Sequence, residues 1–335
     1  MEKKLVLQQL LTHKQGKVPI SFWHHFSAAS GIDLDGYRHP EIMEDNVRKT
    51  RQFVEDVHPD FVKLMSDGLF NYDFNQPLDN PSTIYEGIEP INAQHPWIIE
   101  TRKLVTNQKR VIGNRLGFYN IFSPTTLLKW ALSKHPDGTH DKTTADELLV
   151  KAIIEDRASV AKALDVITRD VIMQATVAIK AGADGIYYST QAIQDDRVDH
   201  GLFSELVEKN DRAVIRAVNK LSDTNILHIC GNRGARNKLG WFANYENSVV
   251  NWSTDVENTS LEEGKEIFQN KVVLGGLGNT TADVLYQGNQ VEIAREIKRL
   301  IKNAGTENVI LSANCTVPRD IDIQHLRWAV SAVKN

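Results

Sequence analysis

Cysteine is scarce in this chain, which holds only Cys230 and Cys315 among its 335 residues. A fold built on several disulfides is therefore excluded, and two cysteines so far apart are most simply inert buried thiols. Positive charge is not in excess either, because 39 lysines and arginines oppose 43 aspartates and glutamates. The net charge of −4 argues against a nucleic-acid partner and against binding to a membrane surface, since both favour basic clusters.

Long hydrophobic runs are also absent. The longest, such as Val309–Ser312 and Val272–Leu274, fall far short of the roughly 20 apolar residues that span a bilayer. The amino-terminal stretch MEKKLVLQQLLTHKQGK has neither the apolar core nor the cleavage site of a signal peptide. We therefore expect a soluble, cytoplasmic protein. No linker rich in Pro, Gly or Ser divides the chain, so we expect residues 1–335 to form a single domain.

What the chain does have is an alternation of short apolar runs with amphipathic helical patterns. The runs are apolar almost throughout, which is typical of parallel strands buried on both faces. Eight strands are predicted, at Val18–Trp23, Phe61–Ser66, Val111–Leu116, Gly185–Ser189, Asn225–Cys230, Ser248–Ser253, Val272–Leu277 and Asn308–Ala313.

The strands alternate with predicted helices at Ala145–Lys180, Phe203–Leu221, Ser260–Gln269, Val291–Ala304 and Ile323–Val333. Ser260 and Glu263 have the spacing of a capping box. In the second half the strands recur every roughly 25 to 40 residues, which suits one βαβ unit each. The pattern predicts an α/β fold with a single (β/α)8 TIM-type barrel; a doubly wound open sheet is the alternative. We expect the longer insertions of the first half, residues 24–60 and 67–110, to lie over the barrel mouth.

Reactive side chains follow two of the predicted strands. In a barrel the active site lies at the carboxyl ends of the strands. His228 and Cys230 end the fifth strand, and residues two apart in a strand point to the same face. Cys315 follows the eighth strand, so we expect the three side chains to converge. One histidine and two cysteines suit Zn²⁺ and leave a fourth position for substrate. The alternative is a pair of ordinary buried thiols.

Other polar residues near strand ends are weaker candidates. Asp67 follows the second strand in KLMSDG, which places a carboxylate at the mouth, although Asp-Gly is also a turn dipeptide. Trp23 and His24 follow the first strand, and Tyr188 ends the fourth. We expect these three to bind substrate, although a surface position is the alternative for the histidine. Of Tyr188 and its neighbour Tyr187, we expect one to line the cavity and the other to lie in the core.

Asn251 and Asp255 lie at the end of the sixth strand, and we expect them to bind substrate as well. Asp255 could act as a provisional fourth zinc ligand that substrate displaces; barrel packing or a helix cap is the alternative. The loop 231–236 could hold an anion through its two arginines and backbone N–H groups, but an ordinary βα loop is favoured. The run GGLGN at 275–279 lacks the spacing of a dinucleotide fingerprint, so no nicotinamide site is expected.

These motifs resemble the uroporphyrinogen decarboxylase superfamily over nearly the whole chain. That superfamily has a (β/α)8 barrel. It includes the decarboxylase of haem biosynthesis and zinc-dependent methyltransferases that move a methyl group from a corrinoid to a thiol such as coenzyme M; cobalamin-independent methionine synthase is a more distant relative. The resemblance rests on KLMSDG at 63–68, AGADGIYYS at 181–189, HICGN at 228–232, VVNWSTDV at 249–256, VVLGGLGN at 272–279 and the ending ILSANCTVPRDIDIQHLRWAV.

The motifs also separate the branches of the superfamily. Asp67 matches the catalytic aspartate of the decarboxylase. The arginine-containing stretch after the decarboxylase's first strand, however, is replaced here by FWHHFSAAS, and the histidine after its last strand is replaced by Cys315. The methyltransferase branch is marked by His-x-Cys and a distant Cys, which match His228, Cys230 and Cys315. The only two cysteines of the chain thus fall on the two required positions.

The resemblance therefore implies a methyltransferase in which these three residues hold Zn²⁺. A small-molecule thiol would bind the metal and become a nucleophilic thiolate, and the methyl donor would be a corrinoid carried by a partner protein. Decarboxylase relatives imply a homodimer. Two alternatives stay open: a carboxy-lyase, uroporphyrinogen decarboxylase, that works through Asp67 without metal, and a catalytically idle barrel that binds a ligand or a corrinoid partner.

Overall fold

A curled, all-parallel β-sheet is the centre of the fold. The computed structural model describes residues 18–26, 35–74, 85–133, 144–191, 195–231, 236–269 and 271–334. Each strand pairs in parallel with the next along the chain, so the strand order is the chain order. All seven carboxyl ends therefore meet at one edge. The strands are β1 Phe61–Leu64, β2 Leu116–Phe122, β3 Gly185–Thr190, β4 Ile226–Ile229, β5 Val249–Trp252, β6 Val272–Leu277 and β7 Val309–Ala313.

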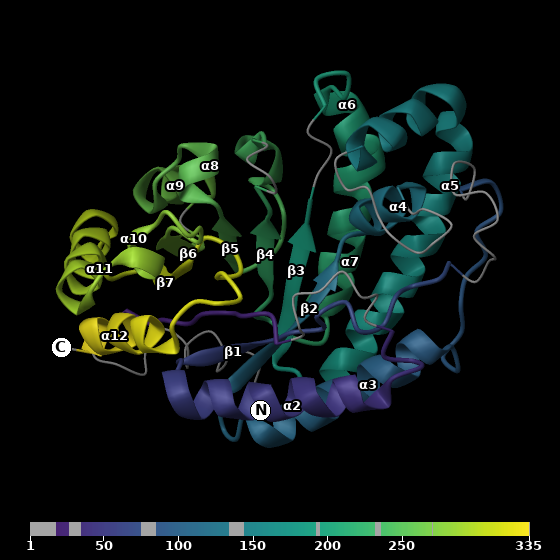
Figure 1. Cartoon of the computed structure of the whole chain (residues 1–335). Helices are drawn as coiled ribbons and strands as arrows, with labels where there is room; N and C mark the ends of the chain where they lie inside the picture. The colour runs from purple at the N-terminus through teal and green to yellow at the C-terminus, as the bar shows by residue number, and fades with distance from the viewer. Residues whose placement is uncertain are drawn as a thin grey trace.

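Helices connect the strands and surround the sheet (Figure 1). A π-helical segment, Phe203–Glu208, leads into α7, and a short 3-10 helix spans Leu239–Phe242. No helix of the described residues is long and apolar enough to cross a membrane. The α-helices are α2 Pro40–Val57, α3 Pro96–Val111, α4 Pro124–Leu132, α5 Ala145–Lys180, α6 His200–Leu202, α7 Lys209–Asn219, α8 Thr254–Glu257, α9 Leu261–Ile267, α10 Val284–Gln287, α11 Gln290–Ala304 and α12 Ile323–Lys334.

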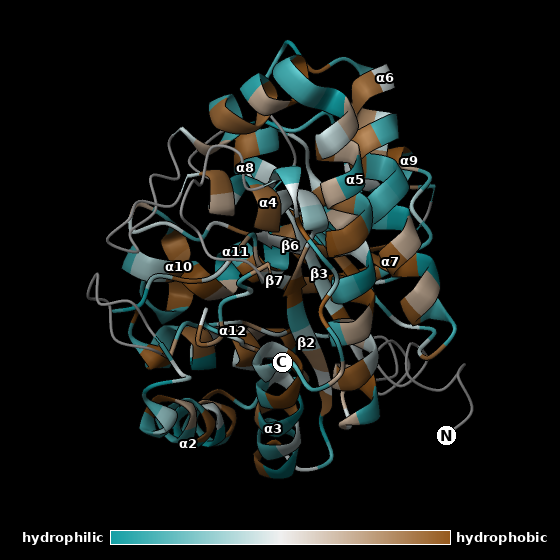
Figure 2. Ribbon diagram, turned by 90° about the vertical axis from the view of Figure 1, so that its right-hand side faces the viewer, coloured by the Kyte–Doolittle hydropathy of each residue, from teal (hydrophilic) through white to brown (hydrophobic). Residues whose placement is uncertain are grey.

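The sheet is buried from both sides, as its apolar strands predict. Every residue of the seven strands is buried except Phe122, which is half-buried. The helices carry hydrophobic and hydrophilic residues in alternation (Figure 2), and their hydrophobic residues join the strands in one core cluster. Burial of this apolar surface is what holds the strands and their carboxyl ends in place.

The helices of the second half confirm the sequence pattern. α5 has the predicted bounds, with one break where Asp156 leaves helical geometry. The predicted capping box is present at α9: the Ser260 side chain accepts from the Glu263 backbone N–H, and the Glu263 side chain accepts from that of Ser260. The predicted helix 203–221 is the π-helical segment followed by α7.

The prediction that residues 24–60 and 67–110 lie over the barrel mouth is largely wrong. α2 packs between α12 and α3, and α3 packs between α2 and α5, so both belong to the layer of helices around the sheet. The reason is topological, because α2 precedes β1 and α3 precedes β2 and each serves as the crossover helix of its strand. Of the two insertions, the segment that follows β1 does reach the carboxyl edge of the sheet, where residues 66–74 border a cavity.

The first predicted strand, Val18–Trp23, forms only an isolated bridge in the described residues, so the described sheet has seven strands rather than the eight of a closed barrel. Ile20 pairs with Leu311 of β7, and the Ile20 carbonyl accepts from the backbone N–H of Asp60 beside β1. The segment 18–23 therefore lies between β7 and β1 without forming a ladder. Two local features limit the pairing: Pro19 has no N–H, and the N–H of Ile20 donates to Asp60 Oδ2 instead.

The third predicted strand, Val111–Leu116, is misplaced. Val111 ends α3, and β2 begins at Leu116. Gly113, with a φ of 65°, turns the chain between the two elements. The apolar run that forms the strand is the following LGFYNIF.

Candidate metal centre

His228, Cys230 and Cys315 come together at the carboxyl edge of the sheet. His228 lies in β4, Cys230 follows that strand, and Cys315 follows β7. Their potential ligand atoms all lie within 4.8 Å of one another. Cys315 Sγ is 3.5 Å from His228 Nε2. A tetrahedral zinc ion with the usual bond lengths places a sulfur and a nitrogen ligand about 3.6 Å apart, so these side chains fit the metal.

A chain of hydrogen bonds orients the imidazole of His228. Asn251 Nδ2 donates to the Leu274 carbonyl at 2.7 Å, which turns Asn251 Oδ1 toward His228. That oxygen contacts His228 Nδ1 and also accepts from the Tyr187 hydroxyl at 2.7 Å. Since Oδ1 only accepts, Nδ1 carries the proton and Nε2 keeps its lone pair for the cysteine side of the site. A hydrogen-bond acceptor behind the ring is what a metal-ligating histidine needs.

The two thiols differ in their acidity. A hydrogen bond from Cys230 lowers the pKa of Cys315 well below its usual range, and the positive charge of the nearby Lys63 acts in the same direction. The same bond, together with burial, raises the pKa of Cys230. Gln191 Nε2 lies 4.0 Å from Cys230 Sγ. The pair therefore presents one sulfur that ionises readily, which is the form that binds metal.

A buried lysine lies beside this cluster. Lys63 of β1 is only 6% exposed, and its ammonium is 4.0 Å from the centre of the Tyr187 ring and 5.4 Å from that of Trp23. The Tyr187 ring in turn contacts Trp23, with centres 5.1 Å apart, and His228, with centres 5.5 Å apart. Trp23 thus lies close to the cluster, and its role in substrate binding stays a prediction. The sequence analysis missed Lys63.

Tyr188 lies on the other face of the sheet. Its hydroxyl donates to Asp211 of α7 at 2.5 Å, and it is Tyr187 that faces His228. Side chains alternate along a strand, so only one of the two adjacent tyrosines can reach the site. The prediction that Tyr188 binds substrate named the wrong member of the pair.

Asp67 is buried in a network that ties the loop after β1 to the segment before α2. Its carboxylate accepts from His25 Nδ1, the Phe26 backbone N–H and Asn46 Nδ2, each at 2.9 Å. Burial alone would raise the pKa of Asp67, but the bond and charge of His25 and the other two donors outweigh burial and lower it. Its catalytic role stays a prediction, since its oxygens already serve three protein donors.

Two other predicted residues form hydrogen bonds with protein groups. His24 Nε2 is 2.8 Å from the Arg319 carbonyl oxygen. Asp255 accepts from Asn314 Nδ2 at 2.8 Å, and burial raises its pKa. Within the described part of the chain Asp255 is not among the grouped ligand atoms, so a role as fourth ligand gains no support. The anion-binding proposal for loop 231–236 falls mainly on residues 232–235, which lie outside the described residues.

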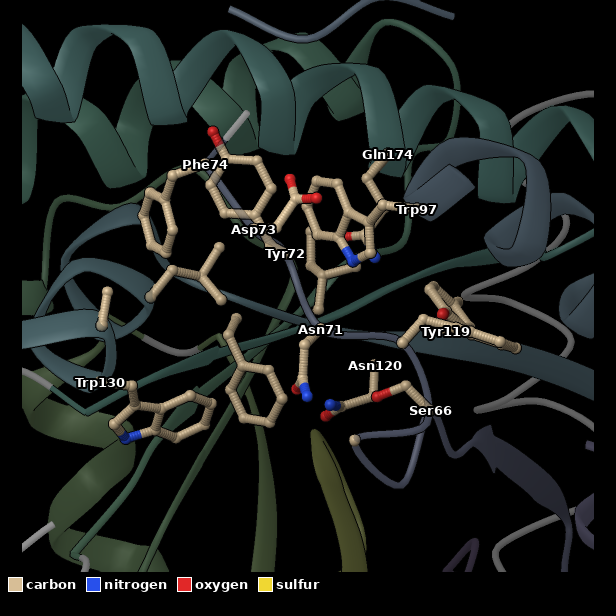
Figure 3. A pocket seen from close by; sticks show the side chains of 16 residues that line it. Ser66, Asn71, Tyr72, Asp73, Phe74, Trp97, Tyr119, Asn120, Trp130 and Gln174 are labelled. Atoms are coloured by element: carbon tan, nitrogen blue, oxygen red, sulfur yellow. The ribbon is translucent and has the colours of Figure 1, made fainter. Parts of the chain in front are cut away.

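A cavity of about 130 Å³ opens at the carboxyl edge of the sheet, over the ends of β1 and β2. Figure 3 shows the polar ends of Asn71, Asn120 and Ser66 gathered on one side of it and aromatic rings, including that of Trp130, around the rest. Asn120 Oδ1 accepts from the Ser189 hydroxyl at 3.1 Å, and Ser189 pairs with His228 between β3 and β4. Asn120 is thus two strands from His228 and is in register with Ile226, two residues before it in β4.

Comparisons with known proteins agree with this architecture. A family model described as "Uroporphyrinogen decarboxylase (URO-D)" matches residues 86–335. No curated protein matches the sequence. Among solved structures, a methyltransferase from Methanosarcina mazei is 16% identical, with a TM-score of 0.69 over 99% of this chain and 98% of that chain. A B12-independent methionine synthase from Shewanella sp. W3-18-1 is 15% identical, with a TM-score of 0.56 over 97% of this chain and 96% of that chain. At such identities these likenesses concern the fold alone.

Proposed function

The chain belongs to the uroporphyrinogen decarboxylase (URO-D) family, and we propose that it is a zinc-dependent methyltransferase that activates a thiol for methyl transfer from a corrinoid. The observation that carries this proposal is the group of His228, Cys230 and Cys315 with the hydrogen-bonded Asn251 behind the histidine. Three protein ligands of this kind leave one position for a substrate, whereas structural zinc sites use four. The methyltransferase and methionine synthase among the similar folds agree with this chemistry by analogy.

Zinc bound to these residues would take the substrate thiol as its fourth ligand and lower the pKa of that thiol, which supplies a thiolate at neutral pH. The protein's own groups prepare the site. Asn251 fixes the ring of His228, and Tyr187 holds Asn251 in turn. Cys315 is already the more acidic of the two thiols. Trp23 and Tyr187, which are buried and in ring contact, would shield the reacting sulfur from water.

Metal analysis of the purified protein tests the ligand set. We expect close to one zinc per chain in the native protein and a large loss in each of Cys230→Ala, Cys315→Ala and His228→Ala. The matched control is His39→Ala, which removes an exposed histidine beside α2 and should keep its zinc. Retention of zinc in both cysteine variants would overturn the proposal.

Turnover is tested with free methylcobalamin and a small thiol. The native protein should demethylate methylcobalamin only in the presence of thiol, and Cys315→Ala should not. A zinc-loaded protein that binds thiol but turns over neither free nor protein-bound methylcorrinoid would favour an idle barrel that binds its ligand.

Uroporphyrinogen decarboxylase is the second candidate, because the family match and Asp67 point to it. It predicts turnover that resists chelators and is lost in Asp67→Asn. The site supports this candidate less well than the methyltransferase, because three protein donors already surround the Asp67 carboxylate. The arginine-containing stretch that would bind substrate carboxylates is also absent from the sequence.

A further inference from the structure

Lys63 is a buried cation in β1 that forms no ion pair with a carboxylate among the described residues. Lys63 is only 6% exposed, and its ammonium lies over the rings of Tyr187 and Trp23. Buried lysines are normally paired. Lys129, which is buried to a similar degree, forms an ion pair with Asp146 at 2.7 Å. An ammonium that is held in place by aromatic faces and forms no carboxylate ion pair in the described residues is suited to bind an anionic ligand.

The charged groups around Lys63 indicate on which side of it an anionic ligand would lie. Burial lowers the pKa of Lys63 to about 8, and negative charge on Cys315, Cys230 and Asp67 opposes that effect. Lys63 is therefore charged at neutral pH. Asp67 already serves His25, Phe26 and Asn46, so the cysteine cluster is the remaining direction. The indole Nε1 of Trp23 is also buried without an acceptor among the described residues.

The zinc-loaded cluster would have no positive charge left to balance a substrate thiolate. Two cysteine thiolates neutralise the two positive charges of a zinc ion, and His228 adds none. The loaded site is then neutral. A substrate thiol that loses its proton adds one negative charge to a site that is largely removed from water. An uncompensated buried charge is strongly unfavourable, so a thiolate there requires a fixed cation.

We propose that Lys63 supplies the counter-charge of the substrate thiolate. This inference rests on the proposed function. The ammonium, fixed on the rings of Tyr187 and Trp23, faces the sulfur that binds next to Cys230 and Cys315. It favours the thiolate over the thiol and so strengthens binding of the ionised substrate at neutral pH. Lys63 acts on the reacting sulfur itself and not on a distant part of the substrate.

Calorimetric titration of zinc-loaded protein with two thiols tests this assignment. 2-Mercaptoethanol has a neutral tail and 3-mercaptopropionate an anionic one. We expect Lys63→Met to keep its zinc and to bind both thiols at least about tenfold more weakly at pH 7, the equivalent of one pKa unit. Lys63→Arg keeps the charge and should recover most of the affinity, which a purely structural role would not require.

The control is Lys271→Met, which removes a lysine that burial also gives a pKa of about 8. Lys271 precedes β6 at the opposite end of the sheet and donates to the Ala243 carbonyl, so thiol affinity should not change.

Three results would overturn the assignment. Unchanged affinity for 2-mercaptoethanol in zinc-loaded Lys63→Met would refute it while the proposed function stands. A loss confined to 3-mercaptopropionate would place Lys63 at the tail of the substrate. Loss of zinc from Lys63→Met would show that the ammonium serves the protein's own thiolates. If the native protein holds no zinc, the proposed function fails, and this inference fails with it.

Discussion

One amide, that of Asn251, determines which nitrogen of His228 faces the cysteines. Its Nδ2 is committed to the Leu274 carbonyl, so its Oδ1 must accept from His228. Replacement by leucine would remove that acceptor and free the ring to turn. Changes at such positions typically weaken metal binding by about 10- to 100-fold.

We therefore expect Asn251→Leu to bind zinc about 10- to 100-fold more weakly than the native protein, measured by competition with a chelator. Asn251→Asp keeps an acceptor for Nδ1 and should lose less. Equal zinc affinity in all three proteins would show that the amide does not orient the ligand.

Asp67 gives a pH-dependent prediction at the same scale. Its pKa is lowered in the folded protein, so it stabilises the fold above its unfolded value of about 4 and ceases to do so as pH falls through the lower folded value. In Asp67→Asn, one amide nitrogen would face N–H donors. We expect a cost of about 1–3 kcal/mol in the free energy of unfolding at pH 7.

Denaturant titrations of native and Asp67→Asn protein at pH 7, 5 and 3 measure that cost. The difference between the two proteins should shrink as the pH falls. A difference that is constant over this range would mean that the carboxylate charge is not what matters.

Single residues divide into those that the sequence could identify and those that it could not. His228, Cys230 and Cys315 could be identified, because strand ends and residue chemistry suffice to bring them together. The choice between Tyr187 and Tyr188 depends on the phase of a strand, which two adjacent tyrosines do not reveal. Lys63 had a usable signal: it is the one charged residue in the apolar run FVKLM.

At the scale of elements, α9 shows how one small residue sets the fit of a helix on the sheet. A Cβ on Gly264 would lie 2.1 Å from Cη2 and 2.3 Å from Cζ2 of Trp252 in β5. Alanine in place of glycine normally stabilises a helix interior by about 1 kcal/mol. Here the indole cannot give way, because its Nε1 is bonded to the Thr259 carbonyl and the ring packs on Phe268.

We expect Gly264→Ala to reduce the free energy of unfolding by roughly 1–3 kcal/mol, as overpacking does in other cores. Chemical denaturation measures the change. Gly240→Ala, where nothing lies within 4 Å of an added Cβ, is the matched control and should be close to neutral. Equal effects in the two variants would contradict the tight packing of α9 on β5.

Elements with strong local signals could be predicted, and those whose shape depends on distant partners could not. The capping box of α9 and the long run of α5 are local. The start of β2 depends on a turn at Gly113 that separates one apolar run from another. The extended segment at Ile20 is limited by the Asp60 side chain, which is 40 residues away.

At the scale of the whole molecule, the candidate metal centre joins β4 to β7, two strands that do not pair with each other. A metal ion there would link separate parts of the curled sheet. The core of the described residues is large and continuous without it. We therefore expect zinc to add stability but not to be required for folding.

Removal of zinc with a chelator should lower the melting temperature and leave the far-ultraviolet circular dichroism spectrum unchanged. A ligand present at 100 times its Kd adds about 2.7 kcal/mol, so the shift should be measurable and should grow with free zinc. Chelation of Cys315→Ala is the control and should have little effect. Loss of helical signal on chelation would mean that the metal is structural.

X-ray absorption at the zinc edge of the purified protein tests the central claim most directly. The account predicts two sulfur neighbours at about 2.3 Å and a histidine nitrogen at about 2.0–2.1 Å, with a third sulfur after addition of thiol substrate. A zinc shell of nitrogen and oxygen only, or a sulfur count that does not rise with thiol, would contradict it.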